Sequence, residues 1–398
     1  MTKKNILFLT PRFPFPLIGG DRLKPYNLMK HLAKKHNVTL ISFYIDLPIK
    51  QAYLKEIEAL GVELIAIPLY VPKAVFRTGM RLFGHRPLEI DFFTQPEFRK
   101  AVNEQLQKKK FDIGISFFMR TAEYLKDMDN IKKILIAEDC RVLYQNRSYK
   151  ESKNIKQKLV RIWEVFKLKK YEPNIVNKFD ITTLVTYEDI NAMKRQNDTA
   201  QYRLLTNGTD IDSFIPPEDF SQRSGILFTG KLDVWSNIMM VFNIVEKVMP
   251  RIREKYPKIQ LNIVGARPPA SILALEDKYT KIHSNVPRFQ PYLQNARVFL
   301  HPHSAATGIQ NKLLEAMSCG CPVVTTPTGN QGIYAKHREH ALIGEEYDQL
   351  ADYTIELLEN DELAKELSAN ARQLIVDTHS WQEVGREIDS IIEELFDE

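Results

Sequence analysis

The chain has 398 residues, 44% of them hydrophobic and 26% charged, which is an ordinary composition for a soluble globular protein. Its length exceeds one core of common size and predicts about two or three domains. The net charge of +5 is too small to indicate nucleic-acid binding, and the sequence lacks the run of 18 apolar residues that would indicate a membrane-spanning helix. Three cysteines, Cys140, Cys319 and Cys321, form neither a disulfide framework nor a metal-ligand spacing, which favours a cytoplasmic protein.

Buried strands alternate with helices through the first half of the sequence. The apolar run at 6–9 follows two lysines directly, so we interpret it as a strand and not as part of a signal peptide. A loop rich in proline and glycine then leads to a helix predicted over 23–35. Further strands are predicted at 38–43, 62–67, 113–116, 134–136 and 181–185. Apolar strands separated by helices indicate an α/β fold with a parallel, doubly wound sheet.

A second set of strands follows a linker that contains an Asn-Gly turn and the pair Pro216-Pro217. These strands are predicted at 226–228, 261–264, 298–300, 322–324 and 342–343. Two similar, Rossmann-like domains are therefore expected, with the carboxyl ends of their strands facing a central cleft.

The most informative stretch runs from Thr307 to Gly329 and places a lysine and a glutamate one helical turn apart. A helix that begins near Gly308 would direct free N–H groups and a positive dipole end towards a phosphate. Lys312 and Glu315 would share one face, so the cation could meet phosphates while the carboxylate accepts hydrogen bonds from a diol. The same spacing also fits an ordinary amphipathic helix with an exposed ion pair.

This stretch resembles the donor-site helix of the retaining family-4 glycosyltransferases, which have the GT-B fold. The residues that fit the family pattern are Glu315, Ala316, Met317, Gly320, Pro322, Val323 and Val324. The preceding residues are most similar to a branch of bacterial sugar transferases associated with exopolysaccharide and cell-envelope loci: Gly308, Ile309, Gln310, Asn311 and Lys312. Thr307 stands eight residues before Glu315, where the family usually has a first glutamate.

The resemblance implies a nucleotide-diphosphate sugar as the donor substrate, with no separate cofactor. Glu315 would hold the ribose hydroxyls and Lys312 the diphosphate, with residues 308–311 beside them and Thr307 at the donor sugar. Residues 1–205 would form an acceptor-binding domain and residues 206–378 the donor-binding domain. The terminal helix, within 379–398, would return to the first domain.

Two further phosphate-proximal positions come from glycine-containing loops. Lys231 follows a strand in Gly230-Lys231-Leu232, which is similar to the family's G-R-L, whereas Ser236 stands where the family often has a second cation. Lys231 is either a phosphate-binding cation or a surface lysine. Gly20 closes the first strand-to-helix loop, where the absence of a side chain would let the donor approach, although a loop that needs a positive φ explains the glycine as well.

Two acidic positions follow strands of the first domain. Asp139 is the candidate for positioning the acceptor or contacting the sugar, in a place where relatives often have His-Asp and this chain has Glu138 before it. The alternative for Asp139 is a helix N-cap. Glu188 lies at another loop of the same rim and could touch the donor, or could complement a helix N-terminus.

No metal site is predicted. Asp210-Ile211-Asp212 lies in the linker, and the pair His301 and His303 has no third ligand spaced nearby. Enzymes of the resembled family commonly stabilise the leaving diphosphate with basic residues and helix dipoles, so a metal is not expected.

Two basic segments raise an anionic membrane surface as a candidate partner. Residues 147–170 carry nine basic and two acidic residues together with apolar residues at helical spacing. A second stripe, Lys73, Arg77, Arg81 and His85, is interleaved with Phe76, Met80 and Phe83. The alternative for each segment is a solvated face over a stripe that faces the core.

The sequence therefore predicts a retaining, metal-independent hexosyl- or glycosyltransferase that moves a sugar from a nucleotide-diphosphate donor to a hydroxyl of a cell-envelope glycan or lipid-linked saccharide. It would lie in the cytoplasm or peripherally on the inner face of the cytoplasmic membrane. A nucleotide-sugar epimerase and a non-catalytic nucleotide-sugar-binding paralogue remain alternatives. A dinucleotide-dependent oxidoreductase is disfavoured because the first strand is not followed by G-x-G-x-x-G.

Overall fold

The computed structural model of the chain describes residues 2–17, 19–45, 48–151, 155–304 and 308–397. The chain forms two compact units, Met1–Thr206 with Val384–Glu398, and Asn207–Glu383. It returns to the first unit after Glu383, five residues beyond the expected boundary at 378. The delay has a local cause, since Ser380 pairs with Thr209 and the Trp381 ring lies against Gly208, both in the second unit.

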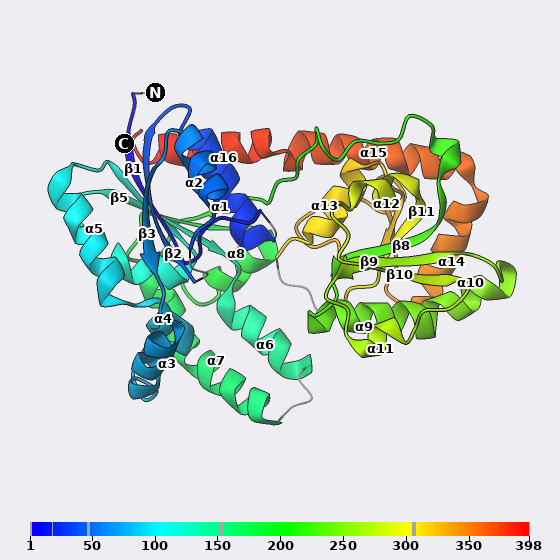
Figure 1. Cartoon of the computed structure of the whole chain (residues 1–398), viewed down its shortest axis with the longest axis horizontal. Helices are drawn as coiled ribbons and strands as arrows, with labels where there is room; N and C mark the ends of the chain where they lie inside the picture. The colour runs from blue at the N-terminus through cyan, green and yellow to red at the C-terminus, as the bar shows by residue number, and fades with distance from the viewer. Residues whose placement is uncertain (1, 18, 46–47, 152–154, 305–307, 398) are drawn as a thin grey trace. The chain divides into compact units, whose positions relative to one another are not determined.

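The first unit is built on a seven-stranded parallel sheet in the order β3-β2-β1-β4-β5-β6-β7 (Figure 1). Its strands are β1 (Asn5–Thr10), β2 (Asn37–Tyr44), β3 (Glu63–Pro68), β4 (Ile113–Phe117), β5 (Lys132–Glu138), β6 (Ile181–Leu184) and β7 (Tyr202–Leu204). This order confirms the doubly wound sheet and places the topological switch point between β1 and β4.

Helices cover this sheet. They are α1 (Gly20–Leu32), α2 (Gln51–Ala59), α3 (Val71–Met80), α4 (Leu88–Phe93), α5 (Pro96–Lys108), α6 (Arg141–Glu151), α7 (Ile155–Val176) and α8 (Tyr187–Lys194). The terminal helix α16 (Trp381–Glu394) packs here as expected: Glu387 accepts a hydrogen bond from the Thr206 N–H at 2.8 Å, and Asp389 lies 2.6 Å from Lys35.

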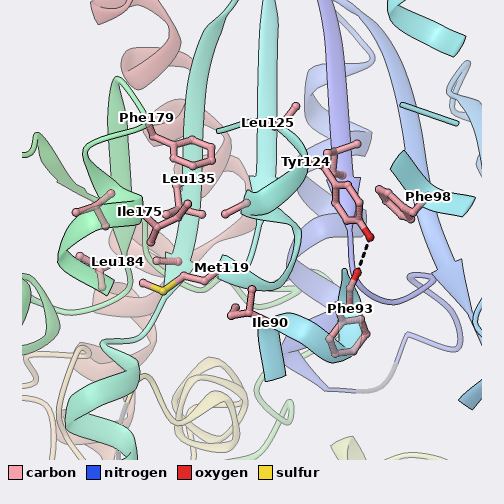
Figure 2. Close-up of a cluster of buried hydrophobic side chains, with 14 of the residues drawn as sticks. Ile90, Phe93, Phe98, Met119, Tyr124, Leu125, Leu135, Ile175, Phe179 and Leu184 are labelled. Atoms are coloured by element: carbon pink, nitrogen blue, oxygen red, sulfur yellow. Dashed lines mark hydrogen bonds between the residues drawn. The ribbon is translucent and has the colours of Figure 1, made fainter. Parts of the chain in front are cut away.

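Aliphatic and aromatic side chains from β1, β2, β5 and the helices around them form the core of this unit. Figure 2 shows Tyr124 and Phe98 at one side of the cluster and Ile175 and Leu184 at the other. The Tyr124 hydroxyl donates a hydrogen bond to the Phe93 carbonyl at 2.5 Å, so the one polar atom of this buried ring is satisfied.

The second unit has a six-stranded parallel sheet in the order β10-β9-β8-β11-β12-β13. Its strands are β8 (Ser224–Lys231), β9 (Leu261–Ala266), β10 (Thr280–Ser284), β11 (Ala296–His301), β12 (Val323–Thr325) and β13 (Leu342–Ile343). Its helices are α9 (Trp235–Asn243), α10 (Met249–Lys255), α11 (Ala270–Leu273), α12 (Gln290–Asn295), α13 (Asn311–Ser318), α14 (Tyr347–Glu359) and α15 (Asp361–His379). Both domains are thus Rossmann-like, as predicted.

Two expectations about elements were incomplete. The edge strands β7 and β10 were not predicted, because β7 has three residues and β10, Thr-Lys-Ile-His-Ser, is largely polar. The single helix expected through 147–170 corresponds to parts of α6 and α7, between which residues 152–154 are not described. None of the helices in the described ranges is both long and apolar enough to cross a membrane.

Candidate functional site

Helix α13 is fixed at its C-terminal end and left open at its N-terminal end. Gly320, with φ of 57°, ends the helix in the left-handed region, and buried Arg223 donates to the Cys319 carbonyl at 2.5 Å. At the other end Gln310 is the N-cap and gives no side-chain hydrogen bond to the helix. The Leu313 N–H donates to the Gln310 carbonyl at 2.8 Å, so among the described residues the N–H groups of Asn311 and Lys312 remain available to an anion.

The helix begins later than the expected position near Gly308. Gly308 has φ of 65°, which is incompatible with a right-handed helix, and Gln310 is extended, so the first helical residue is Asn311. Asn207 holds that residue by donating to the Asn311 side-chain oxygen at 3.0 Å. Ile309 is buried just before the helix. Thr307 lies outside the described residues.

Lys312 does not form the exposed ion pair that the spacing alone allows. Its ammonium donates a hydrogen bond to the Asn237 side-chain oxygen at 2.5 Å and lies 5.5 Å from the centre of the Phe228 ring. Burial lowers the pKa of Lys312 to about 8, against the opposing effect of the Glu315 charge. The ammonium is thus a poorly hydrated cation beside the open end of α13.

Glu315 is one turn further along the same face. Burial raises the pKa of its carboxyl to about 7, and the nearby charge of Lys312 opposes that rise. Within the described part of the chain, neither carboxylate oxygen has a hydrogen-bond or ion-pair partner. A half-buried carboxylate in this state is a ready acceptor for hydroxyl groups.

Asn237 was missed by sequence reasoning and links the two lysines of the site. Its side-chain nitrogen donates to the Lys231 carbonyl at 2.9 Å while its oxygen accepts from Lys312. A Cβ at Gly230 would lie 3.1 Å from the Asn237 amide, so the glycine gives this side chain its room. The sequence feature that could have indicated Asn237 is its position in the first turn of the helix that follows Gly230-Lys231. Lys231 itself is exposed at the end of β8.

Two buried histidines lie near Lys312. The pKa of His303 is lowered to about 3 and that of His301 well below its ordinary value, in each case first by burial and then by the Lys312 charge. Both rings are therefore neutral at physiological pH. Within the described ranges, no group of three or more histidine, cysteine or acidic side chains is arranged to hold a metal ion.

In the first unit, Asp139 follows β5 and is not the helix cap that was weighed as an alternative. The N–H of Cys140 donates to Asp189 at 3.0 Å, and that of Arg141 to Glu172 at 2.6 Å, so these two carboxylates occupy the start of α6. One Asp139 oxygen lies 3.5 Å from the Arg141 guanidinium, and the other is buried without a hydrogen-bond partner.

Glu138 is committed to a structural contact. Fully buried Lys24 lies 2.6 Å from its carboxylate and also donates to the Leu205 carbonyl at 2.7 Å. Burial raises the pKa of Glu138, and the Lys24 charge opposes that rise. Glu138 has φ of 71°, so this residue also bends the chain before Asp139.

Comparison with known proteins identifies the second unit more closely. Residues 223–360 match a family profile described as "Glycosyl transferases group 1", and this range contains Lys231, Asn237, Lys312 and Glu315. These findings support a glycosyltransferase. The match covers the candidate donor site and leaves the first unit outside it.

Two curated relatives span nearly the whole of this chain. An uncharacterised 44.6 kDa protein in the cps region of Klebsiella pneumoniae is 21% identical over 96% of this chain and 97% of its own length. An uncharacterised glycosyltransferase of Methanocaldococcus jannaschii is 22% identical over 99% of each chain.

Solved structures show the same fold. Sucrose-phosphate synthase from Thermosynechococcus elongatus has a TM-score of 0.72 at 16% identity and covers 99% of both chains. HepE from Anabaena, solved in complex with UDP and glucose, has a TM-score of 0.67 at 13% identity and covers 98% of this chain and 100% of its own. These likenesses show that the chain has the GT-B fold.

The remaining predicted residues lie at loops of the first unit. Gly20 is the first residue of α1, preceded by Gly19 with φ of 90°. Glu188 is in the first turn of α8, where Thr186 is the N-cap, so its charge complements that helix end. A cavity of about 440 Å³ opens beside the β1-to-α1 loop and is lined by residues that include Arg12, Arg22, Phe15 and Tyr53.

Proposed function

We propose that the protein is a retaining glycosyltransferase that moves a hexosyl or related sugar from a nucleotide-diphosphate donor to a hydroxyl of a cell-envelope glycan or lipid-linked saccharide. One observation carries the proposal: a poorly hydrated cation and an unpartnered carboxylate lie one turn apart at the open end of α13, inside the matched range. The relative from a cps region supports a role in polysaccharide synthesis.

The donor would lie across the start of α13. Its diphosphate meets the free N–H groups, Lys312 and Lys231, while its ribose hydroxyls donate to Glu315. The UDP held by the neighbour HepE supports a nucleoside diphosphate here. Asn237 orients the Lys312 ammonium, so Asn237 is a positioning residue.

In the reaction, the bond between the sugar anomeric carbon and the diphosphate oxygen breaks, and the acceptor oxygen bonds to the same face of that carbon. The acceptor proton passes to an oxygen of the leaving diphosphate. Negative charge grows on that diphosphate in the transition state, so Lys312, Lys231 and the α13 N–H groups stabilise it without a metal. Asp139 and the aromatic, cationic cavity beside α1 would position the acceptor saccharide.

A panel of nucleotide-diphosphate sugars, each supplied with and without saccharide acceptors, tests this function. Proton NMR of the product should show the donor's anomeric configuration in the new linkage. An inverted anomeric configuration would refute the retaining mechanism but would still establish a glycosyltransferase. An isomerised nucleotide sugar without release of nucleotide would establish the epimerase, and binding without consumption would establish the non-catalytic paralogue.

The affinity for the donor should follow a bell-shaped pH profile, with its maximum between about pH 7 and pH 8. Below the Glu315 pKa of about 7 the ribose loses its charged acceptor, and above the Lys312 pKa of about 8 the diphosphate loses its cation. Calorimetric titration with the selected donor from about pH 6 to about pH 9 measures both limbs. Glu315→Gln should remove the acidic limb and move the alkaline limb to lower pH, because the Glu315 charge raises the Lys312 pKa. A flat wild-type profile would contradict these roles.

A further inference from the structure

The outward surface of α7 is apolar between Ile155 and Phe166, whereas its inward surface combines polar residues with the core residues Leu168, Ile175 and Val176. Ile155, Leu159, Ile162 and Phe166, which recur on one helical face, are each 48% or more exposed. Glu164, Lys167 and Glu172 are instead buried; Glu164 accepts from the Leu88 N–H at 2.9 Å, and Lys167 donates to the Leu82 carbonyl at 2.7 Å. The alternative of a solvated face over a core-facing stripe is therefore wrong for α7.

A neighbouring segment extends this apolar surface. Phe83, at 86% exposure, follows α3 and meets the Trp163 ring edge-on at 6.4 Å between ring centres. Phe76 and Met80 on α3 are 67% and 68% exposed. Figure 1 shows α3 and α7 side by side. We call the following set the docking face: Phe76, Met80, Phe83, Leu159, Ile162, Trp163 and Phe166.

The charges beside the docking face differ between its two halves. On α3 the expected basic stripe is paired with acidic residues, because Lys73 and Arg77 share Glu97 at 2.7 and 3.1 Å, and Arg81 lies 3.7 Å from buried Asp91. On α7 the acidic residue Glu164 faces inward, so Lys169 and Lys170 are exposed beside Phe166 without an acidic neighbour on that face of the described helix. The positive charge that would attract an anionic partner to the docking face is therefore mainly that of Lys169 and Lys170 on α7.

We propose that the docking face inserts into the interfacial layer of an anionic lipid bilayer, with Phe83, Trp163 and Phe166 among the acyl chains and Lys169 and Lys170 at the headgroups. Contiguous exposed aromatic residues on a monomer mark an interaction surface. Cations at its border fit anionic headgroups. A second copy is disfavoured, because a two-fold contact would bring the same cations together. The docking face belongs to the first unit and the candidate donor residues belong to the second, so this proposal does not require the transferase reaction.

Flotation of the full chain with vesicles tests the docking face. The wild type should float with phosphatidylglycerol-containing vesicles and much less with phosphatidylcholine alone. Phe83→Ser with Phe166→Ser should weaken binding by about tenfold, since each ring loses its apolar burial. Lys169→Gln with Lys170→Gln should weaken binding and reduce its salt dependence. Ile215→Ser, at an exposed apolar position in the other unit, is the matched control and should bind like wild type.

Two further readouts keep the result specific. Brominated acyl chains should quench a fluorescence component that disappears in Trp163→Phe, which reports insertion of that ring. Donor consumption in solution should be unchanged in Phe83→Ser with Phe166→Ser, so loss of docking is distinct from loss of transfer. The proposal is overturned if wild type never floats, or if lipid-free wild type is a dimer that this double variant converts to a monomer.

Discussion

Replacing Lys312 with methionine should lower kcat by about 10²–10³, the usual effect of removing one preorganised group that stabilises a developing negative charge. The effect should be large because the ammonium is poorly hydrated and is held by Asn237, so little reorganisation is needed when charge reaches the diphosphate. The affinity for the donor should fall less than turnover, since the extra charge appears only in the transition state. Steady-state kinetics with the selected donor measures both quantities.

Two variants serve as controls for that result. Lys336→Met removes a cation exposed elsewhere in the second unit, where its partner is Glu339, and should leave kinetics unchanged. Asn237→Ala keeps the Lys312 charge but removes its orienting oxygen, so it should lower kcat with a smaller loss than Lys312→Met. If Lys312→Met instead raised KM and left kcat unchanged, Lys312 would bind the donor and the transition state equally well. Lys312 would then have no role in the catalytic step.

Replacing Glu315 with glutamine should weaken donor binding by about 1.5–3 kcal/mol, the usual worth of a hydrogen bond to a charged group. The side chain keeps its size but exchanges a charged acceptor for an amide. The loss should disappear with a donor analogue that lacks both ribose hydroxyls. Calorimetry on both proteins with both ligands forms a double-mutant cycle for this contact.

The Glu315→Gln variant also changes the environment of Lys312. The carboxylate raises the pKa of Lys312, so its removal should lower that pKa further. Titrations near pH 7.5, about half a unit above the Glu315 pKa and half a unit below the Lys312 pKa, keep both groups of the wild type mostly charged. The analogue that lacks the hydroxyls then corrects for the lowered Lys312 pKa of the variant. An equal loss with the analogue that lacks the hydroxyls would assign Glu315 to packing or to Lys312, and not to the ribose.

The architecture could be predicted because each buried strand leaves a strong apolar signal. The runs that became β1, β2, β4, β5, β8, β9 and β11 are hydrophobic and are separated by helices. Short or polar edge strands such as β7 and β10 lack that signal, since solvent covers one side of them.

For the candidate sites, the sequence could indicate which residues lie on which helix or loop, but not which side chains contact one another. Sequence spacing placed Lys312 and Glu315 on one face, but the partner of Lys312 is Asn237, which is distant in sequence. Long-range pairing likewise turned Glu138 into the partner of Lys24 and neutralised Lys73 with Glu97. The apolar stripe of α7 faces outward because the polar residues Glu164 and Lys167 form hydrogen bonds with Leu88 and Leu82 on the inward side. Such contacts follow from tertiary packing, which periodicity does not record.

Amide hydrogen exchange with and without a saturating nucleoside diphosphate is the most direct test of the donor site at the start of α13. We expect slower exchange in peptides that cover the start of α13 and the segment joining β8 to α9. The ligand would accept hydrogen bonds from the N–H groups at the start of α13 and would contact Lys231, Lys312 and Glu315. Lys312→Met with Glu315→Gln should lose that protection while remaining folded. Saturating ligand that protects other segments and leaves these two unchanged would contradict the assignment of the donor site.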